Sequence, residues 1–204
     1  LNSVDKIIFI TKWVKKKFFE GLPSLSDNKT QIIYHSIDPF KKKIKKNKQI
    51  IFVGKLNESK GYDLYCKAMF KILDSNKDWN AYSIGEEKRF QNYPTHSRHK
   101  SLGQISHSKV LEYLGKSEIA IIPSRWEEPF GRTAMEASSR GCATIISKKG
   151  GLPETTDHAI KLKKVDVKNI ENETIKLIKN KNFRKKVQIN SQKYIKHNLK
   201  TNSE

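Results

Sequence analysis

The stretch EIAIIPSRWEEPFGRTAMEASSRGCATIIS, residues 118–147, joins two apolar runs through a polar segment. The runs at 118–123 and 143–147 are apolar nearly throughout, which is typical of strands buried on both faces of a sheet. Between them, residues 132–141 place apolar side chains at helical spacing. A strand, a helix and a second strand in this order indicate a parallel sheet with a crossover helix.

The same alternation extends along the whole chain. Further strand-like runs occur at 7–10, 31–35, 49–54, 79–85, 99–103 and 158–162. Helical spacing recurs at 62–73 and 108–116, and residues 167–200 indicate two helices separated near Asn180–Asn182. The sequence therefore predicts an α/β fold with a doubly wound parallel sheet, of the Rossmann-like kind.

The chain of 204 residues is strongly basic, with 41 Lys and Arg against 21 Asp and Glu. Such a balance suits nucleic acid, an anionic membrane or an anionic small substrate. Most of the excess is lysine spread along the chain, which favours a compositional habit over a basic patch. No apolar stretch approaches the roughly 20 residues that cross a bilayer. Cys66 and Cys142 are isolated, which favours a reduced, cytoplasmic protein, and the histidines show no metal-ligand spacing.

The segment SIDPFKKKIKKNK, residues 36–48, interrupts the alternation with a proline and six lysines. It fits a surface loop, and it equally fits a linker between two α/β units. On the linker interpretation, residues 1–47 are the end of a preceding domain with its linker, and residues 48–204 form the complete domain. Because the first residue is Leu, we expect a piece of a longer protein.

Ligands of an open parallel sheet bind outside the carboxyl ends of its strands. Gly54 follows one such strand, and Lys55 and Lys60 flank the turn, which suits a phosphate or diphosphate. A solvated loop is the alternative, since neither the Walker nor the dinucleotide pattern is matched. Gly85 and Gly103 follow two further strands at the same relative place. Their repetition suggests a close backbone approach at one rim, although ordinary turn chemistry explains each glycine singly.

The segment WEEPFGRTAMEA follows the strand at 118–123. Pro129 disfavours helix at Glu128, so this glutamate should lie in the loop and the helix should begin around Gly131–Thr133. The first N–H groups of that helix would point at an anion, and Glu136 lies about one turn further on. N–H groups can hold a phosphate while carboxylates accept from hydroxyl pairs, so a sugar–phosphate–ribose ligand would use all three parts. Acids also favour first helical turns without any ligand.

In this order and spacing, VGKLNESKG, LGQIS, AIIPSRWEEPFGRTAMEASSRGCATIIS and GGLPE resemble a known family. They are similar to the carboxyl-terminal, nucleotide-sugar-binding domain of GT-B glycosyl transferases of group 1, the retaining family 4 type. The resemblance covers about residues 48–200, and residues 1–47 are similar to the end of the amino-terminal acceptor domain. The signature of two glutamates separated by seven residues is met by Glu128 and Glu136.

The resemblance implies a metal-independent hexosyltransferase without a cofactor, which moves sugar from a UDP or GDP type of donor to a glycan or lipid-linked acceptor. It implies a role in polysaccharide biosynthesis and no nucleic-acid partner. By the resemblance, the donor sugar and phosphates would be bound by Glu128 together with Gly54, Phe130, Gly131, Arg132 and Thr133. Lys55 and Lys60 would neutralise the leaving diphosphate. Glu136 would bind the ribose, and Gln104 and Ile105 would border the nucleobase.

The sequence departs from the family pattern in three respects. Lys55 stands where the family commonly has arginine, which keeps the charge and loses the forked contact. The segment GEEKRF lacks the usual Gly-x-Gly-Pro. The acceptor domain is nearly absent, so we expect this chain to bind nucleotide without turnover.

A non-catalytic alternative is a basic module that binds anionic membrane or nucleic acid through KKKIKKNK and the Lys-rich terminal helices. No stacking aromatic residues are interleaved with these lysines, which disfavours single-stranded nucleic acid. We expect a cytoplasmic location for the enzyme, and peripheral contact with the inner face of the membrane stays open.

Overall fold

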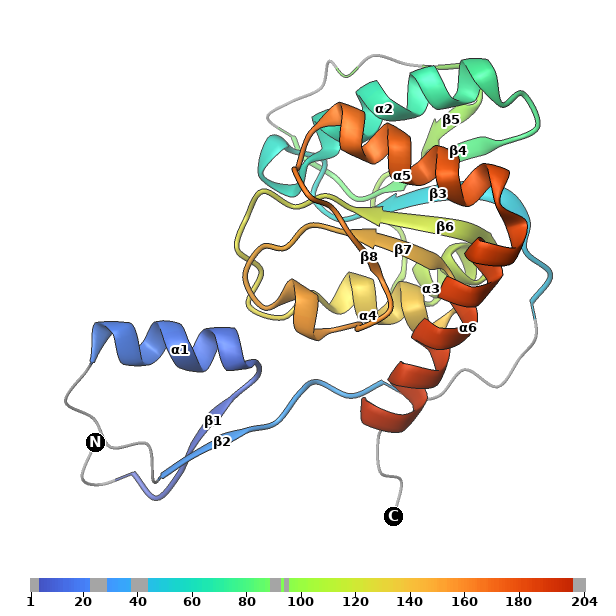
Figure 1. Cartoon of the computed structure of the whole chain (residues 1–204). Coiled ribbons are helices and arrows are strands. Elements are labelled where there is room, and N and C mark those ends of the chain that lie inside the picture. Colours follow the sequence, from blue (N-terminus) through green and yellow to red (C-terminus); the bar gives the residue numbers. More distant parts are fainter. Residues whose placement is uncertain (1–3, 23–28, 38–43, 89–92, 94–95, 200–204) are drawn as a thin grey trace.

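The computed structural model describes residues 4–22, 29–37, 44–88, 93 and 96–199. Within them, six strands form one sheet in the order β5–β4–β3–β6–β7–β8 (Figure 1), and every neighbouring pair is parallel. The strands are Asn47–Val53 (β3), Asn80–Ile84 (β4), His99–Ser101 (β5), Ser117–Ile122 (β6), Ala143–Ile146 (β7) and Ile160–Lys161 (β8). The predicted doubly wound α/β fold is confirmed.

Helices cover both faces of this sheet (Figure 1). They are Tyr62–Ser75 (α2), His107–Lys116 (α3), Arg132–Ser139 (α4), Val167–Lys179 (α5) and Lys181–Asn198 (α6). Ile50 and Phe52 of β3 pack with α2 and α5, whereas Ile51 packs with α3 and α4. Successive side chains of a strand point to opposite faces, so burial of both faces accounts for the continuous apolar runs in the sequence.

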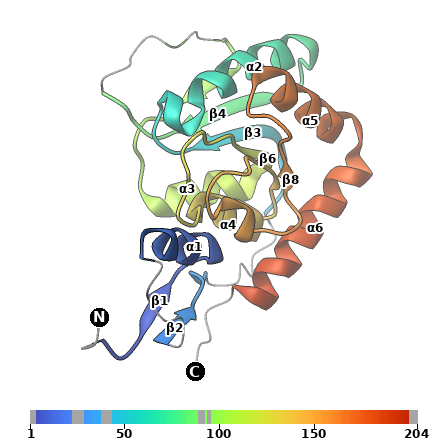
Figure 2. The same ribbon diagram turned by 60° about the vertical axis from the view of Figure 1, so that its left-hand side comes forward.

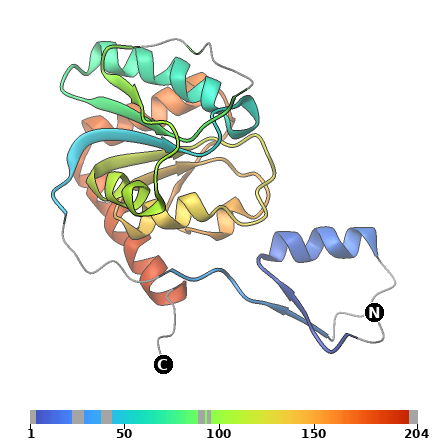
Figure 3. The same cartoon turned by 180° about the vertical axis from the view of Figure 1, so that it is seen from behind.

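A separate small unit precedes the six-stranded sheet. Strands Ile7–Phe9 (β1) and Thr30–Ile32 (β2) form a two-stranded parallel sheet, and helix Lys12–Gly21 (α1) lies between them in the sequence. Figure 2 shows this unit beside α4, and Figure 3 shows the segment after β2 running to the end of α6. There the Ile37 amide donates to the Leu199 carbonyl at 2.8 Å.

Several of the predicted strands are shorter in the structure, and the one expected at 99–103 ends at Ser101. The strand expected at 31–35 ends at Ile32, because the chain then leaves the small sheet and the Tyr34 hydroxyl bonds Glu154. The strand expected at 158–162 is reduced to Ile160–Lys161 at the sheet edge. Helix α1 was not predicted, and none of its residues is buried. Its four apolar residues form two adjacent pairs, Trp13–Val14 and Phe18–Phe19, among six polar or glycine residues.

Part of the lysine-rich segment is held firmly by the domain. The Nζ of Lys46 donates to the carbonyl oxygens of Ser117 and Arg140 at 2.7 Å and of Leu114 at 3.2 Å. Burial lowers the pKa of Lys46. The surface-loop interpretation is therefore wrong for this residue, while residues 38–43 of the segment lie outside the described part of the chain.

The glycines that follow β3, β4 and β5 lie side by side at one rim. The Gly54 amide donates to the Ile84 carbonyl at 3.0 Å, and the Gly85 amide donates to the Gly103 carbonyl at 2.9 Å. A Cβ atom on Gly85 would lie 1.9 Å from the Gly54 carbonyl oxygen. The predicted close approach is real, and at Gly85 it is made to the neighbouring backbone.

Candidate functional site

A cavity of about 360 Å³ opens at the carboxyl ends of β3 and β6. These central strands are neighbours, and the chain leaves β3 towards β4 and leaves β6 towards β7, on opposite sides. Such a switch point is where open parallel sheets bind their ligands. The cavity is lined by Ile10, His35, Phe52, Val53, Gly54, Lys60, Ile122, Ser124, Glu128, Pro129, Phe130, Gly131, Arg132 and Thr133. Its size suits a small molecule.

A charged pair stands on the wall of this cavity. Glu128 lies in the loop after β6, as predicted, and its Oε1 accepts from Lys60 Nζ at 2.6 Å and from Ser124 Oγ at 2.9 Å. The side chains of Lys60 and Glu128 are 28% and 15% exposed. Lys60 is placed by the short 3₁₀ helix Glu58–Lys60 (η2), whose first turn is capped by the Asn57 side chain. The Lys60 ammonium and the Glu128 carboxylate therefore both border the same cavity.

The N-terminus of α4 forms another part of the cavity wall. Gly131 is its N-cap residue, with φ of 101°, and offers no side-chain oxygen to the first turn. Arg132 and Thr133, the first two helical residues, line the cavity. First-turn N–H groups and the positive end of the helix dipole make a binding place for an anion. The predicted helix start at Gly131–Thr133 therefore coincides with the cavity.

The second predicted carboxylate has different neighbours. Glu136 is in α4, its side chain is 8% exposed, and its Oε1 lies 3.0 Å from His107 Nε2 and 3.6 Å from an Arg132 nitrogen. His107 begins α3 and its side chain is 60% exposed. Glu136 does not line the cavity, so the structure places the two glutamates in separate surroundings.

Three predicted site residues also lie off the cavity lining. Lys55 and Gln104 are exposed, and Ile105 packs on the apolar cluster under α3 and α4. The contact between His107 and Glu136 nevertheless ties the segment after Gly103 to α4. Seven predicted residues are brought together in the cavity, namely Gly54, Lys60, Glu128, Phe130, Gly131, Arg132 and Thr133. Their roles stay predictions.

Several lining residues were missed in the sequence. Ile10 and His35 come from the small N-terminal unit, and the His35 ring meets Phe130 edge-on with 5.0 Å between ring centroids. Only the fold brings that unit to the cavity, so no local pattern announces these two residues. Ser124 was detectable in principle, because it comes two residues after the buried strand β6. His107 does not line the cavity, but it contacts Glu136 and was detectable as the first residue of a helix that follows a rim glycine.

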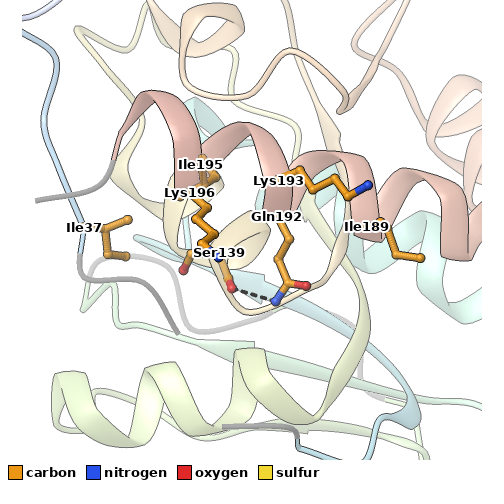
Figure 4. A pocket seen from close by; sticks show the side chains of 7 residues that line it. All are labelled: Ile37, Ser139, Ile189, Gln192, Lys193, Ile195 and Lys196. Atoms are coloured by element: carbon orange, nitrogen blue, oxygen red, sulfur yellow. Dashed lines mark hydrogen bonds between the residues drawn. The ribbon is translucent and has the colours of Figure 1, made fainter. Parts of the chain in front are cut away.

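A second cavity, of about 290 Å³, lies along α6 (Figure 4). It is lined by Ile37, Ser139, Ile189, Gln192, Lys193, Ile195 and Lys196, and the Gln192 amide donates to the Ser139 carbonyl at 3.0 Å. None of the predicted site residues reaches it. Among the described residues, no three His, Cys, Asp or Glu side chains are grouped to hold a metal ion. No helix in that part of the chain is long and apolar enough to cross a membrane.

Solved structures share this architecture. HepE of Anabaena, in complex with UDP, superimposes with a TM-score of 0.82 at 16% identity, over 97% of this chain and 60% of that one. The C-terminal domain of a glycosyl transferase group 1 family protein of Francisella tularensis gives 0.68 at 21% identity, over 76% and 88% of the two chains. The fold is that of the GT-B glycosyltransferases.

The family follows from the sequence itself. The family model described as glycosyl transferases group 1 matches residues 35–194, and the chain belongs to this family. An uncharacterized 42.6 kDa protein of the Klebsiella pneumoniae cps region is 26% identical over 75% of this chain. The phosphatidylinositol N-acetylglucosaminyltransferase GPI3 subunit of Saccharomyces cerevisiae is 24% identical over 89%. The chain spans only 41% and 45% of these relatives, about half their length.

Proposed function

We propose that this chain is the donor-binding part of a retaining glycosyltransferase. The enzyme moves a hexose from a nucleotide-diphosphate sugar to a glycan or lipid-linked acceptor. Membership in the glycosyl transferases group 1 supports the reaction class, and the complexes of HepE with UDP and with UDP-glucose suggest the kind of donor.

One observation carries the proposal. The Lys60–Glu128 pair and the uncapped N-terminus of α4 share one cavity at the switch point of the sheet. A cation and free N–H groups suit a diphosphate, while a carboxylate suits sugar hydroxyls. A ligand with phosphate and sugar parts would use both features of the cavity together.

The same groups supply the chemistry that sugar transfer needs. When the bond between the sugar and the diphosphate breaks, negative charge builds on the leaving oxygen. The Lys60 ammonium and the first N–H groups of α4 would stabilise that charge from fixed positions, without reorganisation during the reaction. These groups would provide the charge stabilisation that a metal ion can provide in other enzymes. We therefore propose a metal-independent reaction without another cofactor.

The two glutamates then act as binding groups and not as the acid and base of a glycoside hydrolase. Glu128 would accept from sugar hydroxyls, and Glu136 would accept from the ribose hydroxyls of the nucleotide. Binding of ribose would compete with the His107 contact at Glu136 Oε1. Lys55 would approach the diphosphate only by moving its exposed side chain, so its role is the least supported.

Turnover would need an acceptor-binding half, of which residues 1–47 would be only the end. We therefore propose that this chain by itself binds nucleotide and does not transfer sugar. The natural acceptor would belong to cell-surface polysaccharide or glycolipid synthesis at the cytoplasmic side of a membrane, with peripheral contact to that membrane.

Isothermal titration calorimetry with UDP, GDP and ADP tests the proposal. We expect saturable binding of one of the three, lost in Glu136→Ala and retained in Glu173→Ala, which removes a carboxylate from α5 instead. Binding that does not distinguish the bases and follows ionic strength alone would contradict the proposal. It would favour a basic module that binds anionic surfaces.

A further inference from the structure

Glu154, the last residue of GGLPE, holds a helix that begins more than a hundred residues earlier. Its Oε2 accepts from the Lys12 amide at 2.8 Å, and its Oε1 accepts from the Trp13 amide at 2.9 Å. Lys12 and Trp13 are the first two residues of α1. A carboxylate in this place satisfies two free N–H groups and faces the positive end of the helix dipole.

Three further hydrogen bonds complete this junction. Thr11 Oγ1 accepts from the Val14 amide at 3.1 Å and donates to the Pro129 carbonyl at 2.8 Å. The Tyr34 hydroxyl, beyond β2, donates to Glu154 Oε2 at 3.0 Å. Glu154 therefore hydrogen-bonds both to the start of α1 and to the segment that follows β2.

The backbone that carries Glu154 packs directly on the loop that carries Glu128. The Gly151 amide donates to the Glu128 carbonyl at 2.6 Å. A Cβ atom added to Gly150 would lie 2.3 Å from the Glu128 carbonyl oxygen. A Cβ atom added to Gly151 would lie 2.4 Å from the Pro129 carbonyl oxygen. Only a double glycine leaves room for this contact, so the junction is built against the cavity wall.

None of the α1 residues is fully buried, and its Phe18 and Phe19 rings pack on Phe9 of the same small unit. The unit meets the six-stranded domain through this polar junction and through the packing of Ile10 and Tyr34 on the apolar cluster that contains Phe130. The residues next to the junction do reach the cavity. Ile10 precedes Thr11, His35 follows Tyr34, and both line the cavity together with residues of the six-stranded domain. The polar junction and this apolar contact therefore act together on the side of the cavity that Ile10 and His35 form.

We propose that Glu154 is a positioning residue, which holds the β1–α1–β2 unit against the donor cavity so that Ile10 and His35 form its second wall. The inference rests on the proposed function for the ligand that this wall meets. A nucleoside diphosphate would contact chiefly Lys60, α4 and Glu136, all in the six-stranded domain. A nucleotide sugar would also reach the second wall.

Hydrogen–deuterium exchange without nucleotide tests the junction alone. In Glu154→Ala we expect the amides of residues 12–14 to exchange about tenfold faster, within the range of a lost helix cap. Glu154→Gln, whose amide oxygen still accepts, should give a smaller increase. Asp157→Ala removes a nearby exposed carboxylate and should change nothing. Unchanged exchange in Glu154→Ala would overturn the proposal.

Calorimetry with paired ligands tests the second wall. UDP and UDP-glucose are the first pair, and GDP with GDP-mannose replaces them where GDP is the nucleotide bound. We expect Glu154→Ala to weaken the nucleotide sugar about tenfold and the nucleoside diphosphate less than about twofold. Equal weakening of both ligands would overturn the assignment, because it would indicate a merely structural effect. A wild-type chain that binds neither ligand while exchange at α1 responds would refute the proposed function and leave the junction established.

Discussion

Helices α1 and α4 begin on the same side of the molecule with the same chemical need, and they meet it differently. Each leaves first-turn N–H groups without an intrahelical partner. At α1, Thr11 and Glu154 accept from the first three amides. At α4, Gly131 supplies no side-chain cap, and the first turn lines the cavity. The chain closes one N-terminus itself and leaves the other open for an anion.

The contrast has an energetic meaning. An N-terminal cap is worth about 0.5–2 kcal/mol to a helix. Retaining glycine at the start of α4 forgoes that contribution, which a bound phosphate would restore. At α1, on our proposal, the caps help to hold the β1–α1–β2 unit, which supplies Ile10 and His35 to the cavity. Both helices therefore need acceptors for their first N–H groups. At α4 these groups are left for a ligand, and at α1 they hold two parts of the chain together.

Closing the open N-terminus should have the largest effect. Thr133→Asp places a carboxylate in the first turn of α4, where it competes with phosphate for the N–H groups and repels its charge. We expect affinity for the nucleoside diphosphate to fall about 100-fold, roughly 2.7 kcal/mol, while thermal stability holds or rises because an acid favours this turn. Calorimetry and thermal unfolding measure the two quantities.

Thr133→Val is the matched control, since it removes the hydroxyl without adding charge. Its affinity should stay within about threefold of the wild type. A Thr133→Asp variant that binds as well as Thr133→Val would show that the first turn of α4 does not hold the phosphates.

Removing the cation beside the open N-terminus should have the next largest effect. Lys60→Met keeps the length of the side chain and loses its charge, and it also deprives Glu128 of its 2.6 Å partner. We expect nucleoside diphosphate affinity to fall about 20-fold, near 1.8 kcal/mol, as for a lost charged hydrogen bond. Calorimetry measures the loss.

Lys179→Met removes an exposed lysine from the last turn of α5 and controls for net charge. It should bind like the wild type at physiological ionic strength. Equal losses in Lys60→Met and Lys179→Met would mean that overall charge, and not a placed cation, attracts the nucleotide.

The open N-terminus was predictable from the sequence and the closed one was not. Pro129 and Gly131 mark the start of α4 locally, and the buried runs around them fix the sheet. Glu154 and Lys12 are 142 positions apart, and their contact exists only through the fold. Similarly, no local sequence pattern indicates that Glu136 contacts His107 or that His35 lines the cavity. Local chemistry predicted elements and their ends, whereas contacts between distant loops needed coordinates.

Weakening the closed N-terminus should cost less than altering the open one. Thr11→Ala removes the cap of the Val14 amide and the bond to the Pro129 carbonyl at a fully buried position. We expect the β1–α1–β2 unit to lose about 1 kcal/mol of local stability, near the typical cost of a lost cap. Exchange rates of the α1 amides measure it. Thr11→Ser keeps the hydroxyl and should lose much less, and equal losses in the two variants would exclude the cap as the cause.

The smallest effect concerns Tyr34 at the edge of the closed N-terminus. Burial, and then its hydrogen bond to Glu154, raise the pKa of Tyr34 from 10.0 to about 12. Because the folded pKa exceeds the ordinary value, the protonated hydroxyl contributes stability fully below pH 10. That contribution should disappear as the pH rises towards about 12, where the phenolate would repel Glu154.

Ultraviolet titration of the phenolate, as the difference between wild type and Tyr34→Phe, measures this pKa. In a Glu154→Gln background it should fall, yet stay above 10, because burial is the larger cause and remains. An unchanged pKa would mean that the Tyr34 hydroxyl does not depend on Glu154. The closed N-terminus would then be held by the two α1 amides and Thr11 alone, and the segment that carries His35 would be placed independently of it.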